Sequence, residues 1–164
     1  MRADLPAELD ALTEKILGAA FTVANTLGNG FLEVIYKNAL AEELISLNCR
    51  VAAEKPFSVF YRDKLMGTYL ADLVVENQVI VELKAIETLS RAHQAQLLNY
   101  LKASKLPVGL LLNFGTPSLQ MKRILNPSVK SVKIREIRVL LQGCRICGHG
   151  AATALTARRN LTAH

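Results

Sequence analysis

The run VGLLLNF at residues 108–114 constrains the fold more than any other stretch of the sequence. It is a short, uncharged and mostly apolar run, and Pro107 and Gly115 bound it on its two sides, which is typical of a buried strand. A strand with apolar side chains on both faces needs cover on both faces, as in the interior of a sheet flanked by helices. The rest of the chain is therefore expected to supply further strands and helices.

The periodicity of the remaining chain predicts these elements. Stretches with apolar residues every three or four positions indicate helices, and alternating or apolar runs between polar turns indicate strands. In chain order we predict helices at 7–27 and about 31–47, strands at 50–61, 66–75 and 79–85, a helix at 91–104, and strands at 108–114 and 119–125. Gly28-Asn29-Gly30 is expected to stop the first helix, and Ser90 to cap the third. This order predicts the α/β (α+β) class, with a mixed central β-sheet and helices packed on its faces.

The distribution of charge divides the chain into two parts. The net charge is +6, but residues 1–127 hold 13 basic and 13 acidic side chains and are neutral as a whole. Residues 128–164 hold 7 basic side chains and Glu136 as their only acid. We therefore predict a domain over 1–127 and a basic, partly disordered extension over 128–164. Bulk charge favours nucleic-acid binding for the extension alone.

Neither a membrane segment nor a disulfide framework is predicted. No apolar run approaches the ~18–20 residues of a transmembrane helix, and the charged N-terminal residues do not resemble a signal peptide. Cys49, Cys144 and Cys147 fit a reducing compartment, so we expect a cytoplasmic protein. Cys144-x-x-Cys147-x-His149 offers up to three of the four ligands of a structural zinc site, and a mobile extension that contacts phosphates is the favoured interpretation.

The strand at residues 79–85 carries two opposite charges on one face. Side chains alternate along a strand, so Glu82 and Lys84 point the same way, and Asp72 on the preceding strand can lie near Glu82 across a hairpin. Two adjacent carboxylates repel each other, and Mg²⁺ or Mn²⁺ between them would remove the repulsion. With Lys84 orienting a water, this arrangement would suit metal-assisted phosphodiester hydrolysis. The alternative is an exposed Glu82–Lys84 ion pair worth under ~1 kcal/mol.

Two predicted helices carry further candidates. Glu33 and Tyr36 share one face of the second helix, where Glu33 could add a carboxylate to a metal site. His93, Gln96 and Tyr100 share a face of the third helix, and Gln96 is expected to be partly buried and to need partners. The alternatives are a glutamate favoured by the helix dipole, a tyrosine at the edge of the core and an ordinary amphipathic helix.

Together these motifs resemble a known family. Gly30-x-x-Glu33-x-x-Tyr36 is similar to the signature of the bacterial GxxExxY proteins. That family is assigned to the PD-(D/E)xK nuclease superfamily, which the chain resembles in Ala71-Asp72, Glu82-x-Lys84 and Gln96-x-x-x-Tyr100. The resemblance covers roughly residues 9–125. It departs from the family pattern at Ala71, which replaces the usual proline, and at Ala24 and Asn29, where relatives often carry histidine and proline.

The resemblance implies a restriction-endonuclease-like core and a role for each matching residue. The implied catalytic residues are Asp72, Glu82, Lys84 and Gln96. The implied ligands of Mg²⁺ (or Mn²⁺) are Glu33, Asp72, Glu82 and the carbonyl of Leu83, and the implied supporting or substrate-binding residues are Tyr36, His93 and Tyr100. Lys84 would assist the attacking water.

We therefore expect a Mg²⁺-dependent nuclease that acts on DNA or RNA, with a homodimer or larger assembly possible. The alternative is a non-catalytic module that binds nucleic acid or protein on the same scaffold. A hydrolase of another phosphate ester has no supporting feature in the sequence.

Overall fold

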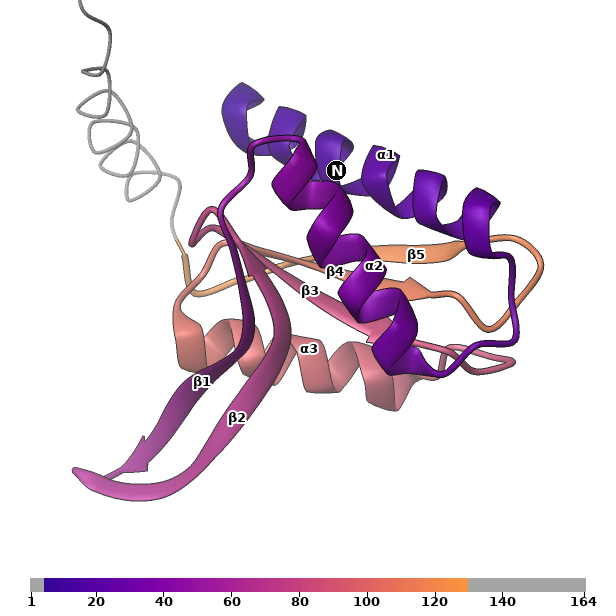
Figure 1. The fold of residues 1–164 in the computed structure, drawn as a ribbon. Helices are drawn as coiled ribbons and strands as arrows, with labels where there is room; N and C mark the ends of the chain where they lie inside the picture. The colour runs from indigo at the N-terminus through magenta and orange to yellow at the C-terminus, as the bar shows by residue number, and fades with distance from the viewer. Residues whose placement is uncertain (1–4, 130–164) are drawn as a thin grey trace, which may run out of the picture.

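A five-stranded sheet separates two helical layers in the computed structural model, which describes residues 5–129 (Figure 1). The strands lie in the order β1-β2-β3-β4-β5, and only β3 and β4 are parallel. Their bounds are β1 (Val51–Tyr61), β2 (Lys64–Val75), β3 (Val79–Lys84), β4 (Val108–Asn113) and β5 (Gln120–Leu125). The predicted mixed sheet flanked by helices is confirmed, and the arrangement is consistent with a restriction-endonuclease-like core.

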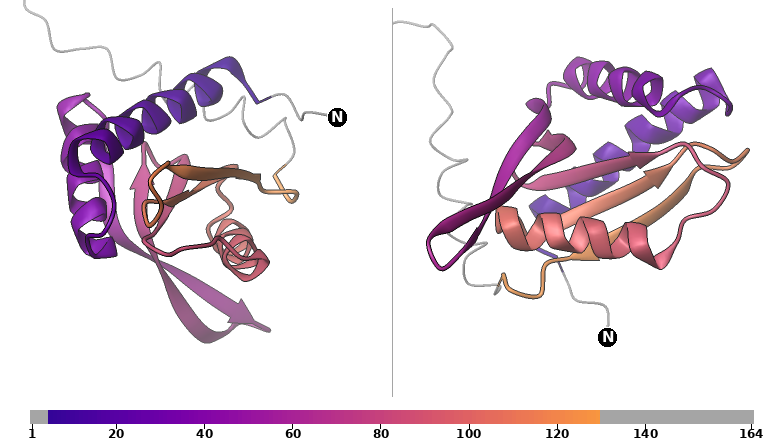
Figure 2. Two further views of the ribbon diagram at one scale, coloured as in Figure 1. Left: turned by 90° about the vertical axis from the view of Figure 1, so that its right-hand side faces the viewer. Right: turned by 90° about the horizontal axis from the view of Figure 1, so that it is seen from below.

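Helices cover both faces of the sheet. The helices α1 (Ala7–Leu27) and α2 (Glu33–Ser46) lie on one face, and α3 (Arg91–Ser104) lies on the other (Figure 2). The helix α3 makes the crossover that parallel β3 and β4 require. Every residue of β4 is buried, as the run at 108–114 predicts. Leu110 and Leu112 pack toward α1 and α2, and Leu111 packs toward α3, so the core has two halves.

The loop between α1 and α2 is held by a buried tyrosine. The hydroxyl of Tyr36 donates a 2.8 Å hydrogen bond to the carbonyl of Gly28 and accepts a 3.2 Å hydrogen bond from the N–H of Phe31. Its ring stacks on Phe114 with the centroids 4.7 Å apart. Gly30 has a φ of 111°, which a residue with a Cβ rarely adopts. These contacts fix where the first turn of α2 begins.

The hairpin of β1 and β2 extends beyond the body of the molecule as an arm (Figure 1). Its turn consists of Arg62 and Asp63, with φ values of 46° and 63°, the signs that a type I′ turn requires. The turn is shorter than the gap between the predicted strands at 50–61 and 66–75, because Lys64 already pairs with Tyr61. Large apolar side chains are exposed along the arm, namely Phe60, Tyr61, Leu65, Met66 and Leu70.

Several predictions concern residues that the structure does not describe. Cys144, Cys147 and His149 lie outside residues 5–129, as does most of the predicted extension, so the division at residue 127 stays a prediction. No helix within 5–129 is both long enough and apolar enough to cross a membrane.

Candidate active site

The candidate site lies where β2 and β3 diverge. The pairing of these strands runs from Val75↔Val79 to Leu73↔Val81, and the next residues along each strand are Asp72 and Glu82. At this point a side chain replaces the backbone ladder, because Asp72 Oδ2 accepts a 2.9 Å hydrogen bond from the N–H of Leu83. Asp72 is thereby held against β3. The predicted proximity of Asp72 and Glu82 is thus found, at the fork between the strands.

A bend in β2 explains how Asp72 reaches β3. Ala71 packs in the half of the core that contains α3, whereas Leu73 packs in the half that contains α1 and α2. Residues two apart in a regular strand share a face, so the strand must turn at Asp72. Between the pairs Ala53↔Leu73 and Lys55↔Ala71, the opposite strand holds Glu54, whose φ is 51°. The arm therefore bends away from the sheet at the position of the aspartate.

Glu82 is a buried carboxyl group with an unsatisfied oxygen. The residue is 2% exposed, and among the described residues its Oε2 has no hydrogen-bond partner. Burial and, second, the charge of Asp72 raise the pKa of Glu82 from 4.5 to about 8, and the charge of Lys84 partly opposes this rise. An ionised carboxylate in this position is costly unless a cation compensates it. The two adjacent carboxyl groups and the free oxygen therefore fit a divalent cation whose other ligands are waters.

Lys84 faces a glutamate of α2. Its Nζ lies 3.7 Å from Oε1 of Glu33, and the side chains of Lys84 and Glu33 are 16% and 42% exposed. Within residues 5–129, no group of three or more histidine, cysteine, aspartate or glutamate side chains is placed to hold a metal ion. Asp72 and Glu82 are thus brought together, while Glu33 lies at the lysine. Leu83 is fully buried, and its N–H is bound by Asp72.

The helix α3 places a tyrosine beside the carboxyl groups. Gln96 Nε2 donates a 3.0 Å hydrogen bond to the hydroxyl of Tyr100, which is 6% exposed. Burial is the main cause that raises the pKa of Tyr100, and the charge of Glu82 is the second. Gln96 finds a partner, as predicted, but it is exposed rather than partly buried. Gln96 is exposed because it lines a pocket between α3 and Tyr69 of β2.

His93 lies at the beginning of α3. Its Nδ1 accepts a 3.1 Å hydrogen bond from the N–H of Ser90, and the Ser90 hydroxyl accepts from the N–H of His93. This reciprocal pair caps the helix, as predicted for Ser90. One ring nitrogen of His93 is therefore engaged by the backbone rather than by the carboxyl groups.

Lys37 is a cation of the site that the sequence analysis missed. Its Nζ lies 2.7 Å from Glu54 Oε1, and its side chain is 14% exposed. The hydrogen bond with Glu54 is the main cause that raises the pKa of Lys37, and the charges of Asp72 and Glu33 add to it. The available signal was its spacing of four from Glu33, which places both on one face of α2.

Asn113 and Gly115 hold the segment that follows Lys84. The buried amide of Asn113 accepts a 3.0 Å hydrogen bond from the N–H of Ile86 and donates a 2.8 Å hydrogen bond to the Ile86 carbonyl. A Cβ at Gly115 would lie 2.2 Å from the nitrogen of Ile86. These close contacts fix the backbone just beyond Lys84. The sequence signal was a polar residue at the end of an otherwise apolar run.

A comparison with models of protein families identifies the family of this chain. The family model of the PD-(D/E)XK nuclease superfamily matches residues 10–124, which include all the candidate site residues named above that lie in the described part of the chain. No match was found among curated proteins. The crystal structure of SSO0001 is similar at 19% sequence identity and a TM-score of 0.48, over 67% of this chain. The match covers 58% of the chain of SSO0001.

Proposed function

Because the chain belongs to the PD-(D/E)XK nuclease superfamily, we propose that it is a divalent-metal-dependent nuclease that hydrolyses phosphodiester bonds of DNA or RNA. The observation that carries the proposal is Glu82, a buried carboxyl group with a free oxygen beside Asp72. A functional site explains this costly arrangement, since a structural role would be served as well by an apolar side chain. We further propose that the protein acts in the cytoplasm and can assemble as a homodimer or a larger oligomer.

Asp72 and Glu82 are the proposed ligands of Mg²⁺ or Mn²⁺, together with the carbonyl of Leu83 and, after a movement away from Lys84, the carboxylate of Glu33. When bound, the ion would polarise the scissile phosphate and lower the pKa of a water. Asp72 is positioned for this role by its hydrogen bond from Leu83. The free oxygen of Glu82 is the site where a ligand bond would replace the missing hydrogen bond.

Lys84 is the proposed partner of the attacking water. Its ammonium group lies on the same face of β3 as Glu82. The carboxylate of Glu33, 3.7 Å from Nζ of Lys84, holds this group near the fork. In this role it would orient the water by donating a hydrogen bond and would offset negative charge on the phosphate. Lys37 would add positive charge on the side of α2. Gln96 and Tyr100 would support the substrate from α3, with His93 holding the start of that helix and Tyr36 holding the loop before α2.

We also propose membership in the GxxExxY group, for which the contacts of the motif offer a physical reason. Gly30 permits the φ of 111°, Glu33 begins α2 at the site, and Tyr36 anchors the intervening loop through Gly28 and Phe31. The three residues thus act together to aim one carboxylate at Lys84.

A non-catalytic binding module is the second candidate. The ion pair between Lys84 and Glu33 favours it, because this pair engages both side chains that hydrolysis would require to be free. The pair is partly exposed and 3.7 Å long, so its contribution to stability is small, under about 1 kcal/mol. A substrate or metal can therefore separate it at little cost.

The test is calorimetric titration of Mg²⁺ and Mn²⁺ into the wild type, Asp72→Asn and Glu82→Gln, with cleavage of labelled DNA and RNA oligonucleotides measured in parallel. The nuclease proposal expects metal binding and cleavage in the wild type, loss of both in the two variants, and loss of cleavage with EDTA. Glu42→Gln is the matched control, because Glu42 is exposed on α2. Metal binding without cleavage would favour the binding module, and cleavage that persists in both variants would refute the assignment.

A further inference from the structure

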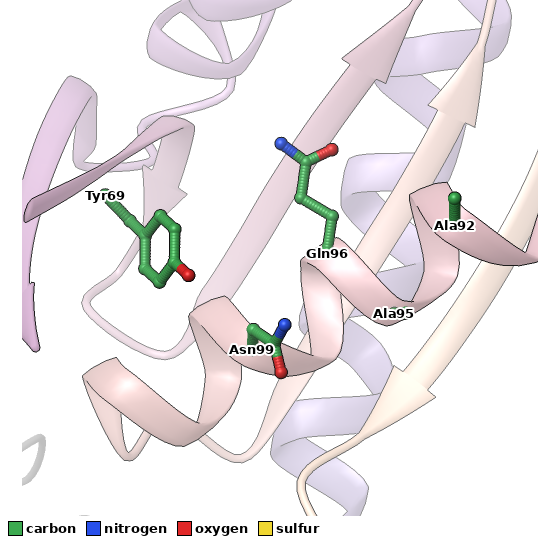
Figure 3. Close-up of a pocket in the computed structure, with 5 residues that line it drawn as sticks. All are labelled: Tyr69, Ala92, Ala95, Gln96 and Asn99. Atoms are coloured by element: carbon green, nitrogen blue, oxygen red, sulfur yellow. The ribbon is translucent and has the colours of Figure 1, made fainter.

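A shallow pocket lies between the arm and α3. Its volume is about 290 Å³, and it is lined by Tyr69 of β2 and by Ala92, Ala95, Gln96 and Asn99 of α3. Figure 3 shows the ring of Tyr69 across from α3, with the side chains of Gln96 and Asn99 projecting from the helix. The volume is at the small end of the range for ligand pockets, which suits one compact group rather than an extended ligand.

The lining of the pocket selects a neutral, planar ligand. None of its five residues carries a charge, so the pocket offers no cation to a phosphate. Tyr69 supplies an aromatic face, and the two alanines supply small apolar contacts. The carboxamides of Gln96 and Asn99 can each donate and accept hydrogen bonds. An aromatic face beside carboxamides is suited to stack a nucleobase and to bind its polar edge.

The pocket adjoins the proposed active site through Gln96 and Tyr100. The ring of Tyr69 lies 4.9 Å from that of Tyr100, and Gln96, which lines the pocket, donates its hydrogen bond to Tyr100. Tyr69 also precedes Asp72 by three residues on β2, which is about 10 Å of strand. A base in the pocket would therefore belong to the same strand as the phosphate at the carboxyl groups, close to the bond that is cleaved.

Stacking on Tyr69 requires that the face of the base be free. Bases within a duplex are stacked on their neighbours, and a protein reaches a base face in a single strand, a loop or an extruded nucleotide. Tyr69 is 39% exposed, so its ring is accessible from solvent.

We propose that this pocket binds an unpaired nucleobase next to the cleaved phosphodiester, so that the substrate is single-stranded or locally unpaired nucleic acid. The proposal rests on the nuclease function proposed above. It assigns Tyr69 and Asn99 as substrate-binding residues, with Tyr69 stacking on the base and Asn99 binding its edge.

The test measures binding in EDTA, so that it does not depend on cleavage. Fluorescence anisotropy with labelled oligodeoxythymidylate and oligouridylate gives the Kd for single-stranded DNA and RNA, and duplexes of the same sequences serve as competitors. Tyr69→Ala should weaken single-strand binding by about 5- to 150-fold, the range expected for loss of one base–aromatic stack. Tyr69→Phe should keep the affinity, and Asn99→Leu should weaken it less than Tyr69→Ala.

Tyr61→Ala is the matched control, since Tyr61 is an exposed tyrosine of the same arm that does not line the pocket. The proposal would be overturned if Tyr61→Ala and Tyr69→Ala lost equal amounts of affinity for single strands, or if Tyr69→Ala bound them as the wild type does. It would also be overturned if the wild type bound duplex and single strand equally well, or bound no oligonucleotide. Tyr69-dependent binding without metal-dependent cleavage would support the pocket and refute the nuclease function. Metal-dependent cleavage with no effect of Tyr69→Ala on binding would support the nuclease function and refute the pocket.

Discussion

Replacing Glu82 with glutamine should stabilise the metal-free protein at neutral pH. The folded state raises the pKa of Glu82 from its ordinary 4.5 to about 8, mainly through burial and then through Asp72. Between these values the unfolded chain loses the proton that the folded chain keeps. The free energy of unfolding therefore falls as pH rises from about 4.5 to 8 and is constant with respect to this group above that window. Glutamine does not titrate, so it removes this loss.

The size of the effect follows from the pKa difference. Each pKa unit corresponds to about 1.4 kcal/mol, so the penalty is under about 1 kcal/mol at pH 5 and about 3 kcal/mol at pH 7. A urea m-value of about 1–3 kcal/mol per molar turns the value at pH 7 into a midpoint difference of about 1–3 M. The amide of glutamine also retains a donor that can bind the carboxylate of Asp72.

The assay is urea unfolding followed by circular dichroism in EDTA, at several pH values from 5 to 8. The midpoint of Glu82→Gln should exceed that of the wild type by an amount that grows with pH. Glu42→Gln, at an exposed position, should follow the wild type at every pH. Saturating Mg²⁺ should then narrow or reverse the difference, because a ligand at 100 times its Kd stabilises the state that binds it by about 2.7 kcal/mol.

A difference in urea midpoint between the wild type and Glu82→Gln that stays constant from pH 5 to 8 would refute this reasoning. It would mean that the fold does not keep the carboxyl group of Glu82 protonated. A pH-dependent difference that Mg²⁺ leaves unchanged would uphold the burial of Glu82 and count against its role as a metal ligand.

Three further substitutions test how the site is held. Tyr36→Phe removes the hydrogen bond to the carbonyl of Gly28 and should lower the free energy of unfolding in urea by about 0.5–1.5 kcal/mol, the net contribution of a typical hydrogen bond; no loss would show that water replaces the hydroxyl. Gly115→Ala places a Cβ 2.2 Å from the backbone of Ile86 and should lower Tm by several degrees, as scanning calorimetry would record; an unchanged Tm would contradict the close approach. Lys37→Gln removes a cation that acts on Asp72 and should tighten Mn²⁺ binding several-fold in calorimetry; equal or weaker binding would argue against that interaction.

The site could be predicted from sequence as far as local periodicity determines it. Strand alternation and the expected hairpin place Asp72 beside Glu82, and both predictions depend on residues close in the chain. The bend at Asp72 could not be predicted, because it results from Ala71 and Leu73 packing in different halves of the core. The role of Asn113 was hidden for a similar reason, since its partner Ile86 lies 27 residues away.

The net charge of the domain does not describe the charges at the fork between β2 and β3. The net charge of residues 1–127 is zero, which gives no indication of a nucleic-acid surface. Opposite charges are nevertheless gathered at the candidate site, where the largely buried side chains of Lys37 and Lys84 lie near the two carboxyl groups. Local arrangement therefore matters more than the sum for what this surface can bind.

The bend at Asp72 couples the hairpin arm to the geometry of the candidate site. Asp72 belongs to the strand that forms the arm, whereas Glu82 belongs to the interior of the sheet, and beyond Leu73↔Val81 the hydrogen bond from Leu83 to Asp72 takes over from the backbone ladder. A hydrogen bond to a charged group contributes about 1.5–3 kcal/mol. A force on the arm that strains this single bond would change the separation of the two carboxyl groups, while the rest of the sheet stays in register.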